Sequence, residues 1–294
     1  MVVGRCNKVL LTSLLVLISF FNAIASDFNG GFINVKKAFN QGLVDVEMIS
    51  LGCYNGDCLT MFLTNKTEKT LLLEIDAGQM LEPFDPTFQP FLIKNRQKLA
   101  LPAGVSKELV IAVFGGNMKK QVPGNEQYFA FADSTPNLWY QVTNYLAIND
   151  FEEALAQKAV WSVTNQFPMN AVCSTNKKET ARIRLYLKSI LPYEDQGMNL
   201  FFKTDSLGIP SNELASIRLE VPYSVRNNTM VSFYITNKRG EMVKKLKQGI
   251  PRNPGSYTYE VEFPVSGWRP GEYFIIMRSP EQLLLKKPFT IESF

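Results

Sequence analysis

Short stretches in the first half of the chain alternate apolar and polar residues with a period of two. A half-buried strand has this period, because successive side chains point to opposite faces of a sheet. Turn-forming residues separate the stretches, so the pattern predicts a sandwich or a barrel-like sheet. The predicted strands include residues 43–50, 59–65, 71–76 and 106–116.

The apolar period changes to that of a helix after residue 134. Leu138, Val142 and Leu146 recur on one side of a predicted helix. Thr135 directly precedes Pro136, and this order suits an N-cap followed by the first helical position. We therefore expect the helix to begin at this pair.

Two more helices follow in the same way. Residues 151–165 form the second, and the spacing of Asp150 and Glu153 resembles a capping box at its start. Residues 177–191 form the third, which Pro192 ends because proline cannot continue a helix. Strands followed by helices indicate an α+β arrangement.

The second half of the chain returns to β structure. About six short strands occur at the spacing of roughly 8–12 residues that is typical of a small sandwich. We predict an all-β, Ig-like β-sandwich over residues 213–294. Residues 193–212 form a linker with one short strand, and residues 26–192 form an α+β domain, a small β-sandwich followed by about three helices.

The N-terminus has the layout of a secretory signal peptide. Arg5 and Lys8 precede an apolar run over residues 10–21, and Ala23 and Ala25 give a small-x-small cleavage site. The alternative is a membrane anchor, but the run is short and no basic stop-transfer cluster follows it. We predict a signal peptide over residues 1–25 and export to the periplasm, the cell surface or the medium. No stable transmembrane segment is expected in the remainder.

The composition narrows the possible chemistry. The chain has 294 residues and no histidine, which removes Ser-His-Asp and Cys-His catalysis and the commonest zinc ligand. It shows no glycine-rich phosphate loop, so we expect no metal and no cofactor. The formal charge of +4 falls to +2 once Arg5 and Lys8 are removed, and such a nearly neutral chain is not expected to bind nucleic acid.

Cys53 and Cys58 lie between two predicted strands and flank the dipeptide Asn55-Gly56. This dipeptide is a strong signal for a two-residue hairpin turn. The turn would place the two cysteines opposite each other, at about the Cα separation that a disulfide accepts. We predict that they form a disulfide. Capture of one of them by Cys173 is the alternative, while a metal site lacks enough ligands.

Three motifs follow one another in the C-terminal region: a strand that ends in D/N-x-x-G-x-x-V, a later G-x-Y and a final K-K-hydrophobic segment. The matching residues are Asn237, Gly240, Val243, Gly271, Tyr273, Lys286, Lys287, Phe289 and Ile291. With these motifs the region resembles the Ig-like sandwich of the sorting domains of type IX secretion in Bacteroidota and of the Ig-like module of flagellar hook-capping proteins. The resemblance implies a sandwich that serves in sorting, attachment or assembly.

Three segments of the first domain carry a second resemblance: residues 58–81, the segment LPAG at 101–104 and the helix QKAVWSVTN at 157–165. With these segments the domain is similar to a poorly characterised class of bacterial exported domains. It implies a small sandwich followed by helices and carries no established chemistry.

A proline-rich loop at residues 82–91 carries several aromatic side chains, and such a loop can form a binding surface. Plugging the open end of its own sandwich is the alternative. The candidate binding residues are Phe84, Asp85, Phe88, Gln89 and Phe91.

These observations favour a non-catalytic exported protein that binds or scaffolds a protein or surface-glycan partner. Two alternatives stay open from the sequence. One is a secreted hydrolase that uses only Asp and Glu residues, and the other is a subunit of an envelope secretion or assembly machine.

Overall fold

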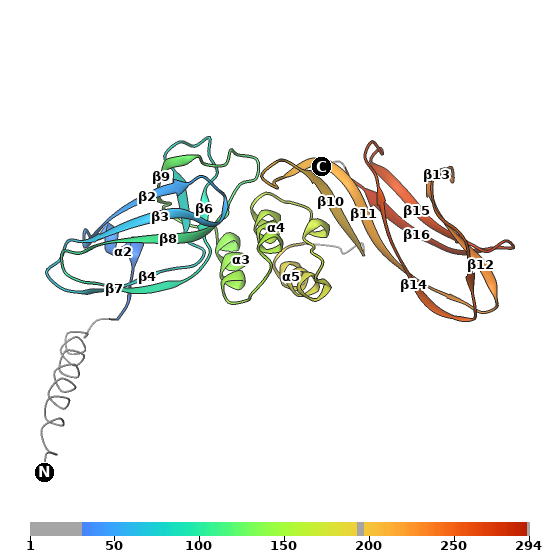
Figure 1. Ribbon diagram of the computed structural model, residues 1–294, viewed down its shortest axis with the longest axis horizontal. Helices are drawn as coiled ribbons and strands as arrows, with labels where there is room; N and C mark the ends of the chain where they lie inside the picture. The colour runs from blue at the N-terminus through green and yellow to red at the C-terminus, as the bar shows by residue number, and fades with distance from the viewer. Residues whose placement is uncertain (1–30, 193–196, 293–294) are drawn as a thin grey trace, which may run out of the picture.

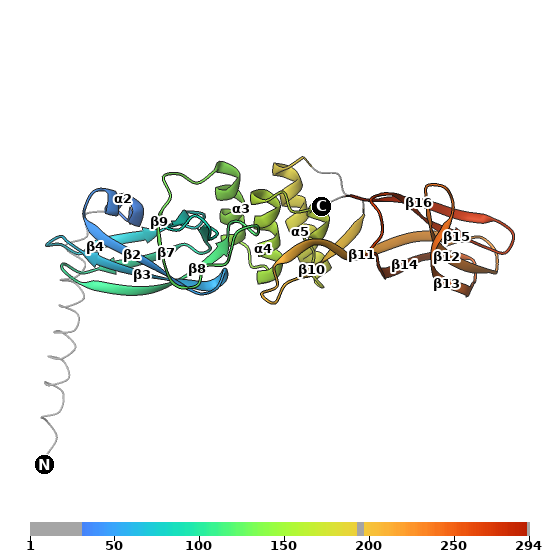
Figure 2. The ribbon, with the colours of Figure 1, turned by 90° about the horizontal axis from the view of Figure 1, so that it is seen from above.

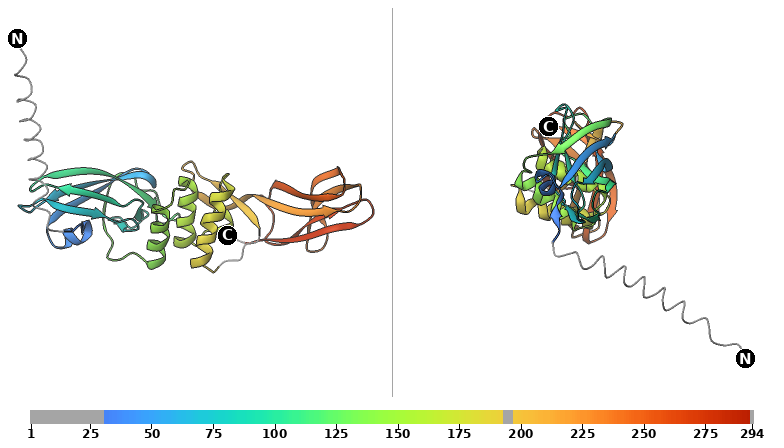
Figure 3. Two further views of the ribbon diagram at one scale, coloured as in Figure 1. Left: turned by 90° about the horizontal axis from the view of Figure 1, so that it is seen from below. Right: turned by 90° about the vertical axis from the view of Figure 1, so that its left-hand side faces the viewer.

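The computed structural model of the chain describes residues 31–192 and 197–292, so the predicted signal peptide lies outside the described residues. Figure 1 shows a β-barrel, a group of helices and a pair of β-sheets following one another along the longest axis. The same order is seen in the perpendicular views of Figures 2 and 3. Most of the molecule is β structure, as predicted.

The first half of the chain folds around a closed six-stranded barrel. The sequence predicted a small β-sandwich, and the same alternation of side chains suits a barrel, whose strands also have one buried face. In barrel order the strands are β2 (Val44–Leu51), β3 (Asn55–Asn65), β8 (Ser106–Gly115), β6 (Phe91–Ile93), β5 (Met80–Pro83) and β9 (Asn125–Phe131).

A second, three-stranded sheet packs against the barrel. It consists of β1 (Ile33–Asn34), β4 (Leu71–Ile75) and β7 (Gln97–Leu101), with the short helix α2 (Val35–Asn40) beside it. Leu73 of β4 and Leu63 of β3 belong to one buried cluster, so the sheet and the barrel share a core.

Three helices follow the barrel, as the apolar period predicts. They are α3 (Asn137–Ala147), α4 (Glu153–Thr164) and α5 (Lys177–Ile190), with a 3₁₀ turn at Met169–Ala171 before α5. Val142, Leu155 and Ile183 from the three helices join Phe114 of β8 in one buried cluster. The helices therefore form a layer that packs on one end of the barrel.

The N-terminal ends of α3 and α4 differ from the prediction. The Thr135 hydroxyl accepts a hydrogen bond from the Met80 amide instead of capping α3. The N-cap position of α4 is Glu152, and its side chain makes no capping bond, so the predicted capping box is wrong. A tertiary partner on β5 takes the Thr135 hydroxyl away from its local role.

The C-terminal part of the chain contains two sheets. One has the order β10 (Met198–Thr204), β11 (Pro210–Val225) and β14 (Gly255–Pro264). The other has the order β13 (Met242–Arg252), β12 (Thr229–Asn237), β15 (Gly271–Arg278) and β16 (Leu283–Ile291). The short strand predicted within residues 193–212 is β10, and it pairs antiparallel with β11.

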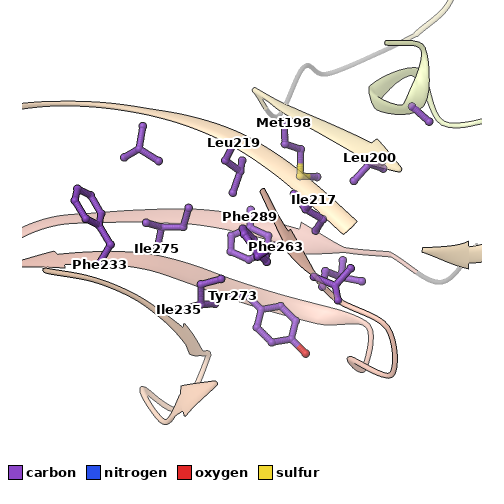
Figure 4. Close-up of a cluster of buried hydrophobic side chains, with 14 of the residues drawn as sticks. Met198, Leu200, Ile217, Leu219, Phe233, Ile235, Phe263, Tyr273, Ile275 and Phe289 are labelled. Carbon is purple, nitrogen blue, oxygen red and sulfur yellow. The ribbon is translucent and has the colours of Figure 1, made fainter. Parts of the chain in front are cut away.

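Alternate residues of the two sheets face each other across a buried core (Figure 4). Ile217 and Leu219 of β11 lie on one side, and Phe233 and Ile275 lie on the other. Trp161 of α4 belongs to the same buried cluster. The helix layer and the C-terminal sheets are thus held together by apolar contact. None of the helices that the structure describes is long and apolar enough to cross a bilayer.

Candidate functional site

Cys53 and Cys58 form the predicted disulfide, with their Cα atoms 5.2 Å apart. Cys53 lies in the connection between β2 and β3, and Cys58 is fully buried on β3. Cys173, the free cysteine of the described residues, is also buried. Burial raises the pKa of the Cys173 thiol, which keeps it protonated and unreactive at neutral pH.

The predicted turn at Asn55-Gly56 is wrong. Ser50 pairs with Leu59, so the register of the hairpin is shifted relative to one closed by this dipeptide. Asn55 and Gly56 instead continue β3 beyond the end of β2, where they pair with β8. The ladder that β8 offers therefore outweighs the local turn preference of the dipeptide.

Tyr54, which lies between the two cysteines in sequence, joins the three parts of the molecule. Its ring stacks on Trp161 of α4, with the ring centroids 5.7 Å apart. Its hydroxyl donates a hydrogen bond of 3.2 Å to the Leu207 carbonyl, in the turn between β10 and β11. Burial raises the pKa of the Tyr54 hydroxyl, and the nearby Asp205 carboxylate adds to this.

Gln157 of α4 attaches the helix layer to the end of β8. Its side-chain amide donates to the Gly115 carbonyl at 2.9 Å and accepts from the Gly115 amide at 3.0 Å. The Gln157 side chain thus makes the two hydrogen bonds with Gly115 that a neighbouring strand would otherwise make. Gln89 lies so close to Gly115 that a side chain at position 115 would collide with it. Both amide atoms of Gln89 are buried and have no hydrogen-bond partner among the residues that the structure describes.

The five candidate residues of the proline-rich loop do not form one surface. Phe84 is exposed and stacks on Tyr128, with the ring centroids 6.2 Å apart. Asp85 accepts hydrogen bonds from the Thr87 amide and hydroxyl, which lower the pKa of its carboxyl. Phe88 is half-buried, whereas Gln89 and Phe91 are fully buried.

A hollow lies away from this loop, between α5 and the sheet of β10 and β11. Its volume is about 690 Å³, and we call it the α5 groove. Of the residues that the structure describes, five cationic side chains line it, against one carboxylate, Glu220. The cationic residues are Lys177, Arg184, Lys188, Arg218 and Lys287.

Two of the cations are already neutralised. Lys177 contacts Glu220 at 2.6 Å and Glu260 at 3.0 Å, and hydrogen bonds to these carboxylates raise the pKa of its ammonium group. Arg218 pairs with Glu262 at 2.7 Å. The carboxylate that lines the groove is therefore held by a lysine.

The other three cations make no ion pair within the described part of the chain. Arg184 donates to the carbonyls of Val172 and Asn170, which fix its guanidinium without neutralising the charge. Lys287 donates to the Glu220 carbonyl at 3.1 Å. Lys188 is exposed at the wall of the groove. Among the described residues, the groove thus presents positive charge without ion-pair partners from both of its sides.

The α5 groove was not predicted from the sequence, although one signal for it was present. Lys177, Arg184 and Lys188 recur at spacings of seven and four residues, which places them on one face of a helix. Arg218 and Lys287 lie far away in sequence, and only the packing of α5 beside β11 brings them near. The spacing of residues along the sequence therefore could not predict that Arg218 and Lys287 line the groove.

No protein-family model matches this chain, and no curated protein sequence matches it. Among the described residues, no group of three or more carboxylate or thiol side chains is arranged to hold a metal ion.

Proposed function

We propose that the protein is an exported, non-catalytic binding protein that takes up an anionic ligand in the α5 groove. The observation that carries the proposal is the presence of Arg184, Lys188 and Lys287 around one hollow, each without an ion-pair partner in the described residues. A volume of 690 Å³ is within the range of ligand sites in proteins. An acidic glycan or an acidic protein segment of the cell envelope supplies the complementary charge.

Ion pairing supports a binding role over hydrolysis. A glycosidase-type mechanism needs two carboxyl groups facing one substrate. Within the described ranges, Glu220 is the one carboxylate that lines the groove, and Lys177 holds it at 2.6 Å. Because Glu220 is held in this ion pair, its position fits the role of a residue in the groove wall that positions Lys177.

The test of binding uses polygalacturonate and polyglutamate as glycan and peptide probes, with affinity measured by calorimetry at two salt concentrations. Wild type is expected to bind one of them, and K188E/K287E to lose at least about tenfold in affinity. K119E/K120E removes the same charge away from the groove and is expected to bind like wild type. Equal binding by wild type and K188E/K287E contradicts the proposal.

The wider layout is part of the same proposal. Residues 1–25 are a signal peptide, residues 26–192 form one domain, and residues 193–212 link it to an Ig-like sandwich over 213–294. The resemblance to sorting domains supports a role of this sandwich in sorting, attachment or assembly. The Cys53–Cys58 disulfide supports export, because disulfides persist in oxidising compartments.

Intact masses of the protein from periplasm, cell surface and medium test the layout. A mass that begins at Ser26 supports export. A cut near residue 200 in surface or medium fractions supports sorting, whereas full-length protein confined to the periplasm contradicts sorting and leaves attachment or assembly. Retention of residues 1–25 in every fraction contradicts the signal peptide.

A further inference from the structure

A row of paired residues on the outer surface of the barrel has exposed apolar side chains at its two ends. Tyr128, Ile49, Thr60 and Val110 lie directly opposite one another on β9, β2, β3 and β8. Ile49 is half-buried and Thr60 is buried in the middle of the row. Tyr128 is 47% exposed and Val110 is 49% exposed. Phe84, which is 72% exposed, stacks on Tyr128 and extends the row. Backbone ladders hold these side chains in register, so the row is preformed.

Carboxylates lie directly beside this row. Phe62 of β3 is opposite Glu47 on one side and Glu108 on the other. Glu82 lies opposite Ala130, two residues along β9 from Tyr128. All three glutamates are exposed, and none makes an ion pair within the residues that the structure describes. We call this surface, from Phe84 to Val110 with its glutamates, the acidic aromatic face.

The C-terminal sheets carry a surface of opposite charge. A groove of about 620 Å³ lies on the sheet of β12 and β15, and we call it the C-terminal groove. Tyr234 and Ile276 lie opposite each other in its lining. Met242 and Leu283, also in the lining, are 60% and 49% exposed. Several apolar side chains of the groove are thus open to solvent.

Four cations lie among these apolar side chains, and no carboxylate lines the groove within the part of the chain that the structure describes. Arg278 and Lys286 make no ion pair within the described residues, and the Lys286 ammonium lies 4.0 Å from the centre of the Phe274 ring. Lys238 and Arg239 also line the groove, each with one carboxylate neighbour. The apolar side chains and the positive charge of the groove therefore complement the acidic aromatic face.

The two surfaces belong to opposite ends of the molecule. The strands β2, β3, β8 and β9 lie at one end of the long axis, and β12, β13, β15 and β16 lie at the other (Figures 1 and 2). One molecule cannot bring them together. We propose that the acidic aromatic face of one copy docks into the C-terminal groove of a second copy, head to tail.

Such an interface uses different surfaces on its two sides, so every pair of molecules retains one free face and one free groove. The association then continues into a chain of molecules unless its rotation closes a ring. It does not involve the α5 groove, so it is independent of the anionic ligand. It would give an exported binding protein the repeated display of that groove along one assembly.

Sedimentation velocity of the chain from Ser26 at low salt tests the association, up to about 100 μM because such interfaces are often weak. Two charge-reversal variants are needed, E47K/E108K on the face and R278E/K286E in the groove, with circular dichroism to confirm folding. Wild type is expected to grow in mass with concentration, and each variant alone is expected to be a monomer. F84A removes apolar contact without changing charge and is expected to weaken association about tenfold.

Mixing the two charge variants gives the decisive result. One variant retains a working groove and the other a working face, so the mixture is expected to associate again although each variant alone does not. The reversed face and the reversed groove carry opposite charges as well, which favours the same mixed association. K119E/K120E serves as the charge-matched control and is expected to associate like wild type. A wild type that stays monomeric at the highest concentration overturns the proposal, as does a mixture that forms no dimer.

Discussion

The ring of Tyr54 stacks on the indole of Trp161 with a centroid separation of 5.7 Å, while the Tyr54 hydroxyl reaches the Leu207 carbonyl. Tyr54 belongs to the barrel end, Trp161 to the helix layer and Leu207 to the turn that precedes β11. One side chain therefore contacts all three parts of the molecule. The disulfide between its sequence neighbours Cys53 and Cys58 restricts the loop from which it projects.

Tyr54→Ala is expected to lower the free energy of unfolding by about 2 kcal/mol, because it removes a half-buried ring from Trp161. Tyr54→Phe retains the stacking and loses only the bond to Leu207, so a loss of about 1 kcal/mol is expected. Urea denaturation of the two variants beside wild type measures both. Equal losses would show that stacking contributes nothing.

Replacing Cys53 and Cys58 together by serine is expected to cost roughly 2 kcal/mol, because the bridge closes a loop with a sequence separation of only five. The fold is expected to survive, since the β2–β3 ladder does not depend on the bridge. Thermal and urea unfolding of the double variant check this. Complete loss of folding would mean that the bridge holds more than its own loop.

Gln157→Leu is expected to destabilise the protein by about 3 kcal/mol, because it removes the Gln157 side-chain partner of both the buried amide and the buried carbonyl of Gly115. Gln157→Glu is expected to cost more at pH 7, where a buried carboxylate cannot donate to the Gly115 carbonyl. Acidification protonates that carboxyl and restores a donor, so the gap between Gln157→Glu and wild type should narrow as the pH falls. Urea denaturation at pH 7 and pH 5 measures the gap, and a constant gap would contradict the importance of this donor.

Glu262 should contribute a pH-dependent term to stability. Hydrogen bonds from Ser216 and from Arg218 lower the pKa of its carboxyl. A depressed pKa in the folded state adds stability above the ordinary glutamate pKa, and this is lost as the pH falls through the folded value. Glu262→Gln should therefore be less stable than wild type at pH 7, by less than about 1 kcal/mol because the pair is largely exposed.

Unfolding of Glu262→Gln and wild type at pH 7 and pH 3 measures this term. The two proteins should converge at the lower pH, where the carboxyl of wild type takes up a proton. A difference that grows on acidification would mean that the folded state raises the pKa of Glu262 instead of lowering it.

Helix positions could be predicted because they depend on a periodic pattern within one segment. The helix at 177–191, for example, is observed as α5 at Lys177–Ile190. The disulfide was also predictable, since Cys53 and Cys58 lie close in sequence. The turn at Asn55-Gly56 was not, because its pairing with Val113 and Phe114 of β8, which lie far away in sequence, decides whether the dipeptide turns or extends β3.

The candidate binding loop shows the same limit. Composition groups Phe84 with Phe91, but strand pairing directs Phe91 into the barrel core and leaves Phe84 exposed. Likewise, the α5 groove needs Lys188 and Lys287 on opposite walls, and no local pattern relates residues so far apart. Sites of this kind require the tertiary fold.

The link between Gln157 and Gly115 also bears on the order in which the chain can fold. The amide and the carbonyl of Gly115, at the end of β8, are hydrogen-bonded to the side chain of a residue 42 positions later in the sequence. A chain that emerges N-terminus first therefore has this strand end unpaired until α4 has been made. The barrel and the helix layer consequently mature as a single cooperative unit, and a fragment that ends before α4 exposes an incomplete strand end through which it can aggregate.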